Sequence, residues 1–133
     1  MKKTAFLTIF ALAAVAAAAQ TLPEKAMKYL EVAFPERSVL MLDAKINYEV
    51  MLDDFTEIEF NSRGEWTEID AKKQGDIPRT AVPSKILESV ARHFDAQKIV
   101  KMERDRHGNY EVELANGIEI EYNRDFMIID IDK

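Results

Sequence analysis

Closely spaced glutamates are the residues of this sequence with the clearest chemical potential. Glu57 and Glu59 are two positions apart, and Glu119 and Glu121 repeat that spacing. In a β-strand such a pair projects from one side with about 6.5–7 Å between its members, which overlaps the carboxylate separation of inverting glycosidases. That reaction also needs a pocket, an apolar wall that raises one pKa, and aromatic residues that stack on sugars. The sequence around the pairs indicates none of these, so we predict that the protein is not an enzyme.

Other catalytic and metal-binding residue types are sparse. His93 and His107 have no local set of further ligands of the kind that a zinc site requires. The serines lack a Gly-x-Ser-x-Gly elbow, and four glycines do not form a phosphate-binding loop. We therefore predict no metal site and no cofactor. Calcium accepts carboxylates in flexible geometry, so weak binding at the surface stays an alternative, with candidate ligands Asp53, Asp54, Asp130 and Asp132.

The first residues have the features of an export signal. Lys2 and Lys3 give a positive start, an uncharged apolar run covers residues 6–15, and alanines lead up to Gln20. The run is shorter than the roughly 20 residues of a membrane-spanning helix. We predict a signal peptide over residues 1–19, cleavage between Ala19 and Gln20, and a protein released into the periplasm or secreted.

The net charge restricts the classes of partner, and the cysteine content restricts the sources of stability. The net charge is −6, and cleavage would remove two lysines and no acids, which takes the net charge to −8. Nucleic acids and anionic membranes bind basic patches, so we expect neither as a partner. The chain has no cysteine, which excludes disulfides and a lipid-modified cysteine, so its stability must come from an ordinary hydrophobic core.

The two halves of the sequence repeat each other. NYEVMLDDFTEIEFN at residues 47–61 and NYEVELANGIEIEYN at residues 109–123 are identical at nine of fifteen positions. The match extends outward at an offset of 60, which becomes 62 after a two-residue insertion at His107-Gly108. A repeat of this length indicates two copies of one structural unit. We predict that residues 20–76 form the first unit and residues 77–133 the second.

Each unit is predicted to contain one helix followed by four strands. Apolar residues recur at helical spacing over residues 22–34 and 86–94. Strands are predicted over residues 38–44, 47–52, 56–60 and 65–71, and again over 98–104, 109–114, 118–122 and 127–133. The short connections leave no room for crossover helices, so neighbouring strands must run antiparallel. The predicted fold is α+β, with both helices on one face of an antiparallel sheet, and whether the two units share one sheet stays open.

Strand alternation predicts one apolar face and one acidic face. The apolar face, which includes Leu40, Ile129 and Ile131, should carry the helices. The candidate partner-binding residues lie on the other face and are Trp66, Met51, Ile128, Glu49, Glu57, Glu59, Glu111, Glu113, Glu119, Glu121 and Asp130. An antiparallel sheet often leaves one face exposed to water, so the simplest interpretation of these acids is that they are solvated. Like charges opposite one another nonetheless cost stability, which favours a binding role for these acids.

The repeated pattern resembles that of a known family. It runs Tyr-Glu-Val-x-Leu, then Glu-Ile-Glu with Phe or Tyr and Asn, then a turn and an Ile-Asp ending, all preceded by a helix that proline leads. This pattern is similar to that of exported PepSY-like proteins, which are themselves described as similar to the β-lactamase-inhibitor protein. The resemblance implies a helix packed on an antiparallel sheet, repeated, with an open sheet surface available to a partner protein. It brings no catalytic residues with it.

These observations predict a non-enzymatic exported binding module, an inhibitor or modulator of another exported protein that has a basic surface. The acids would guide the encounter, and Trp66 would anchor the partner. A calcium-binding surface and a structural domain without a specific ligand remain as alternatives. The partner's identity and the oligomeric state stay open.

Overall fold

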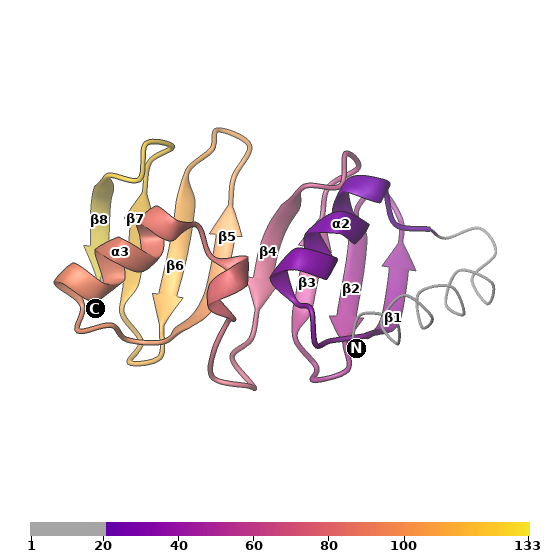
Figure 1. Cartoon of the computed structure of the whole chain (residues 1–133). Coiled ribbons are helices and arrows are strands. Elements are labelled where there is room, and N and C mark those ends of the chain that lie inside the picture. The colour runs from indigo at the N-terminus through magenta and orange to yellow at the C-terminus, as the bar shows by residue number, and fades with distance from the viewer. Residues whose placement is uncertain (1–20) are drawn as a thin grey trace.

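One eight-stranded antiparallel sheet dominates the computed structural model of the chain, which describes residues 21–133 (Figure 1). The strands follow one another across the sheet in chain order as β1 (Val39–Ala44), β2 (Tyr48–Leu52), β3 (Glu57–Phe60), β4 (Trp66–Asp70), β5 (Ile99–Arg104), β6 (Tyr110–Leu114), β7 (Glu119–Tyr122) and β8 (Ile128–Asp132). Each strand lies within one residue of its predicted bounds. The predicted signal peptide, residues 1–19, lies outside the described residues and stays a prediction.

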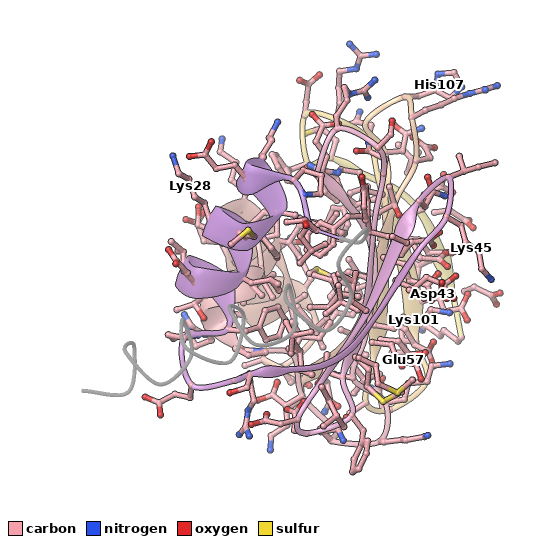
Figure 2. All side chains as sticks on the ribbon, turned by 90° about the vertical axis from the view of Figure 1, so that its right-hand side faces the viewer. Lys28, Asp43, Lys45, Glu57, Lys101 and His107 are labelled. Carbon is pink, nitrogen blue, oxygen red and sulfur yellow. The ribbon has the colours of Figure 1, made fainter. Side chains whose placement is uncertain are left out.

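Both helices lie on the same face of this sheet (Figures 1 and 2). α2 spans Glu24–Ala33 and α3 spans Ser84–His93, and a 3₁₀ turn, η1 (Arg79–Ala81), precedes α3. Each helix buries a stripe of residues at three- and four-residue spacing, formed by Ala26, Leu30 and Ala33 in α2 and by Ile86, Ser89 and Val90 in α3. The predicted α+β class is confirmed.

β4 and β5 join the two halves into one sheet. Ile69 lies opposite Met102 in this pair, and both side chains are completely buried. Beyond the ladder, the Ala71 N–H donates to the Val100 carbonyl over 2.8 Å. The sequence left open whether the two units share one sheet. They do, because the sheet is continuous from β1 to β8.

Four of the strand pairs contain a shift of register, and these shifts change which residues face the helices. One shift places Trp66 opposite Phe60, and another places Ile128 opposite Tyr122. An extra residue in a strand breaks the strict alternation of side chains, so the residues beyond it turn to the other face. The prediction that Trp66 and Ile128 lie on the acidic face is therefore wrong. Trp66 is 6% exposed and belongs to the core, and Ile128 packs against that core.

The two outer strands leave apolar side chains uncovered. Leu40, Ile129 and Ile131 are predicted to lie in the core, but they are 54%, 52% and 43% exposed. Leu40 and Ile129 lie at register shifts. Ile131 lies opposite Ile120 of β7, but among the described residues β8 has no strand on its other side. Edge position, rather than residue type, therefore decides the exposure of Ile131.

Candidate functional site

The face of the sheet that carries no helix holds a row of eight carboxylates, one from each strand. The row, called here the acidic row, follows the pairing from strand to strand and consists of Asp43, Glu49, Glu59, Glu68, Glu103, Glu111, Glu121 and Asp130. Figure 2 shows Asp43, at one end of the row, on the side of the sheet away from α2. Neighbouring strands are about 4.8 Å apart, so each carboxylate within the row lies close to two others of the same charge.

A second row runs beside the first, two residues along each strand. This mixed row consists of Met41, Met51, Glu57, Asp70, Lys101, Glu113, Glu119 and Asp132. It begins with two methionines and contains one cation, Lys101, near the middle of the sheet. The two rows together make a surface that is acidic along its whole length and partly apolar over β1 and β2.

Two lysines neutralise part of this charge near the middle of the sheet. Lys101 Nζ lies 3.8 Å from the Glu68 carboxylate and 3.7 Å from that of Glu103. Lys72 Nζ lies 3.1 Å from Glu113 Oε1. Burial lowers the pKa of Lys101, but Glu68, Glu103 and the other acids around it outweigh that effect and raise the pKa above its ordinary value. Lys101 is therefore held as a cation within the acids.

The half of this face that β1 to β4 form is hollowed. The hollow has a volume of about 410 Å³ and is lined by Met41, Asp43, Glu49, Val50, Met51, Glu57, Ile58, Glu59 and Glu68. At its rim Lys45 Nζ lies 3.3 Å from Asp43, and the side-chain amide of Asn47 donates to Glu59 over 3.1 Å. Methionine side chains beside carboxylates suit the apolar stem and charged head of a lysine or arginine.

Burial and neighbouring acids raise the pKa of two acids on this face. Burial raises the pKa of Glu68, and neighbouring acids add to that rise although Lys101 opposes it. Burial also raises the pKa of Glu111, together with a hydrogen bond to Glu103 and the charge of that residue. Both shifts mean that the folded protein disfavours the charged form of these groups. A cation placed beside them would relieve this unfavourable interaction.

Nine of the eleven predicted partner-binding residues lie in these two rows. Trp66 and Ile128 do not, because the register shifts turn them toward the helices. The predicted partner-binding residues did not include Asp43, Glu68 and Glu103, which complete the acidic row at β1, β4 and β5. Alternation of side chains within each strand is the signal that could have identified them. Asp43, for example, is two residues from Met41 and therefore lies on the same face of the sheet.

Phe55 is a further exposed residue, in the turn between β2 and β3. Its side chain is 53% exposed, and its backbone has a φ of 70°. Gly117 occupies the same place in the β6–β7 turn, with a φ of 92°. The N–H of each residue donates to a carbonyl three residues back, over 2.9 Å in both turns. The first hairpin thus presents an exposed aromatic side chain where the second has none.

Among residues 21–133, no group of three or more histidine, cysteine, aspartate or glutamate side chains is placed to hold a metal ion. No helix in the same part of the chain is long and apolar enough to cross a membrane. What the face offers a ligand is a set of carboxylates at strand spacing beside two methionines.

The fold and this face define an α+β protein with its helices on one side of a continuous sheet and acidic rows on the other. The family model described as "Putative beta-lactamase-inhibitor-like, PepSY-like" matches residues 46–130, and the chain belongs to this PepSY-like family. The family resemblance seen in the sequence is thereby confirmed. None of the curated proteins matches the chain.

Solved structures of three Bacteroides proteins share this fold. One from Bacteroides vulgatus, described as a putative periplasmic protein of the DUF2874 family, is 35% identical, with a TM-score of 0.74 over 84% of this chain and 91% of that one. A second protein from Bacteroides vulgatus, described as a putative periplasmic protein of unknown function, is 32% identical, with a TM-score of 0.72 over 84% of this chain and 92% of that one. A protein from Bacteroides thetaiotaomicron, described as a putative calcium-regulated periplasmic protein, is 29% identical, with a TM-score of 0.75 over 84% and 91%.

Proposed function

We propose that this protein is a non-enzymatic exported binding module that recognises a basic surface on another exported protein. The observation that carries the proposal is the acidic row, eight carboxylates on a face that neither helix covers. Like charges directly opposite one another destabilise a sheet by roughly 0.2–1 kcal/mol per pair. Solubility needs acids on a surface but does not need them aligned. A cationic partner would relieve the repulsion and gain specificity from the match of charge.

The hollow over β1 to β4 is the part of this face best suited to a partner side chain. The stem of a lysine or arginine lies on Met41 and Met51, while Glu49 and Glu57 bind its charged head. The hollow over β5 to β7 has a volume of only about 60 Å³ and is already lined by a cation, Lys101. We therefore expect the β1–β4 half to contribute more binding free energy.

Location and family support the same role. The relatives are described as putative periplasmic proteins, which supports export through the predicted signal peptide. Cleavage between Ala19 and Gln20 stays a prediction. The description of the family as inhibitor-like supports a modulator of another exported protein rather than an enzyme. We also infer two equivalent units, residues 20–76 and 77–133, because Tyr48 opposite Phe60 recurs as Tyr110 opposite Tyr122.

The proposal is tested by capture from a periplasmic extract with matched variants. Glu49→Gln combined with Glu59→Gln removes two charges from the acidic row, and Glu24→Gln combined with Glu31→Gln removes two from the exposed side of α2. Captured proteins are identified by mass spectrometry, purified, and titrated against each variant. We expect the row variant to bind about tenfold or more weakly, which corresponds to about 1.4 kcal/mol. Equal binding by both variants would contradict the proposal.

A divalent cation is a second candidate ligand for the same face. The relative described as calcium-regulated favours it, and neighbouring carboxylates such as Glu49 and Glu59 supply the oxygen ligands that calcium prefers. Ligand that binds only the folded state raises the melting temperature. Calcium should therefore raise it while sodium at equal ionic strength does not, and the row variant should reduce the rise. An unchanged melting temperature in the calcium titration of the unmodified protein would exclude this candidate.

A further inference from the structure

Exposed apolar side chains gather at the two free edges of the sheet. Of the eight exposed large apolar residues within residues 21–133, five lie in an outer strand or directly next to it, namely Leu40, Met41, Met127, Ile129 and Ile131, and a sixth, Ile46, lies in the turn after β1. Within residues 21–133, β1 and β8 each pair with one strand only. Sheet edges template pairing with another chain unless charges, bulges or cover protect them. β1 and β8 each contain a register shift, but so do β4 and β5, which pair with each other nonetheless. A register shift therefore does not prevent these edges from pairing, and both carry uncovered apolar side chains.

The pairing of β4 with β5, called here the seam, shows what covers the equivalent positions of the repeat in the middle of the sheet. Ile69 of β4 aligns with Ile131 of β8 in the repeat, yet it is 0% exposed where Ile131 is 43% exposed. Val100 of β5 aligns with Leu40 of β1, and it is 7% exposed where Leu40 is 54% exposed. The residue types are alike, so the neighbouring strand makes the difference. β4 and β5 cover each other, whereas no strand in the described part of the chain covers the outer side of β8 or of β1.

We propose that β8 of one copy pairs with β1 of a second copy, so that the sheet continues head to tail. Strand direction permits this, because neighbours alternate across the sheet and β8 therefore runs opposite to β1, as β4 runs opposite to β5. The register of the seam places Ile131 opposite Leu42 of the second copy and Asp132 opposite its Met41. All helices stay on one face, and the acidic rows of the two copies become one longer row. A head-to-tail contact of this kind leaves both ends free to add further copies.

The proposed pairing lacks the lysine that supports the seam. Lys101 lies opposite Asp70 and beside Glu68 at 3.8 Å, whereas the aligned position in β1 is Met41. Where Glu68 lies opposite Glu103 in the seam, Asp130 would lie opposite Asp43 of the second copy. Repulsion between exposed carboxylates is screened by salt. Association should therefore be weak at low ionic strength and stronger at high ionic strength.

Single cysteines test the register directly, because the natural chain has none. Residues directly opposite one another in an antiparallel pair have Cα atoms about 4.5–5.5 Å apart, within the range of a disulfide. Asp132→Cys mixed with Met41→Cys should form a disulfide-linked dimer under mild oxidation, more than either variant does alone. Lys28→Cys, on the exposed surface of α2, mixed with Asp132→Cys gives the background rate. A faster disulfide in Asp132→Cys alone or Met41→Cys alone would show pairing of like edges and overturn the proposal.

Sedimentation provides an independent measurement on the purified protein. Met41→Lys restores the cation of the seam at a position that is 61% exposed, and it should strengthen association about tenfold at low salt. Ile131→Lys should weaken association about tenfold, with circular dichroism confirming that the monomer is folded. Met41→Lys would weaken a contact between two β1 edges, so its sign separates the two arrangements. A protein that stays monomeric at high concentration and high salt, with no disulfide above background, would overturn the proposal.

Discussion

Phe55 holds a backbone conformation that the second hairpin gives to glycine. Its φ of 70° lies in the left-handed region, where a residue with a Cβ is strained by about 1–2 kcal/mol. The side chain gains little burial in return, since 53% of it stays exposed. Strained and exposed residues of this kind are found at functional sites more often than elsewhere. Replacing Phe55 with glycine distinguishes a role of this side chain in folding from a role in binding.

We predict that Phe55→Gly stabilises the protein by about 1 kcal/mol, because it removes the strain and little buried area. The free energy of unfolding is measured by urea denaturation. Gly117→Phe is the matched control. It should destabilise the second hairpin, because a residue with a Cβ must then adopt the φ of 92° that Gly117 has. A loss of stability in Phe55→Gly would instead show that Phe55 packs on its surroundings. If the variant is more stable and binds the captured partner more weakly, Phe55 is a contact residue.

At the scale of single residues, the sequence placed most side chains on the correct face but misplaced Trp66. Alternation works as long as a strand has no extra residue, which is why Glu49 and Glu59 lie where they are predicted. A register shift depends on how two strands pair, so the sequence of one strand does not show it. Trp66 instead lies in the core, where the Arg104 guanidinium is 4.6 Å from the centre of its ring and donates to the Trp66 carbonyl over 2.8 Å.

At the scale of the elements, the strands align their acids because each contributes the same register position. The pairing of Glu49 with Glu59 recurs as Glu111 with Glu121, and the β4–β5 seam joins the two sets. The repulsion in such a row depends on pH, since it disappears when a carboxylate is protonated. Two acids of the row have a raised pKa, with burial as the first cause and the neighbouring acids as the second. These are Glu68 and Glu111, in neighbouring parts of the row.

We predict that the free energy of unfolding rises as pH falls from 7 toward about 5. The pKa of Glu68 and that of Glu111 are raised by burial and by neighbouring acids, so the folded chain keeps these protons at a pH where the unfolded chain has lost them. Stability is therefore present at low pH and is lost as pH rises through the raised pKa. Urea denaturation at a series of pH values measures this. A rise of roughly 0.5 kcal/mol is expected from the repulsion between paired acids.

Glu68→Gln combined with Glu111→Gln is the control for this pH dependence, and it should flatten the profile between pH 7 and about 5. Glu65 acts in a different range. Hydrogen bonds from Asn61, Lys25 and Arg63 lower its pKa to about 2, so its contribution is kept above the ordinary glutamate pKa and lost only in stronger acid. A profile that falls with decreasing pH in this window, or that is equally steep in the double variant, would contradict the assignment to Glu68 and Glu111.

At the scale of the whole molecule, the seam makes one folding unit out of two halves. Ile69 and Met102 are completely buried against each other's strands, and the Thr80 hydroxyl in η1 donates to the Ala33 carbonyl at the end of α2 over 2.7 Å. Tyr29 of α2 donates to the Ala81 carbonyl over 3.0 Å. Separation of the halves would expose the seam to water, which favours unfolding of both together.

We predict a single thermal transition for the whole protein. Leu30→Ala in α2 and Ile86→Ala in α3 each create a cavity at a fully buried position, so each should lower the same transition by about 2–5 kcal/mol in free energy of unfolding. Calorimetry measures the transition, and equality of the calorimetric and van't Hoff enthalpies tests whether it is two-state. Two transitions, with only one of them shifted by each variant, would show that the halves unfold independently.

The sequence by itself determined the number and order of the α-helices and strands, and the bounds of the strands to within one residue. Helical and strand periodicities are local, and the repeat reports each of them twice. The sequence also determined that acids and apolar residues segregate, because alternation is a property of a single strand. Only the tertiary structure decided that the two halves share one sheet, that Trp66 is buried and that the acids form one row. Those features depend on pairing between strands, on register shifts and on which strands lie at an edge. Pairing involves residues far apart in the chain, and so no local pattern specifies it.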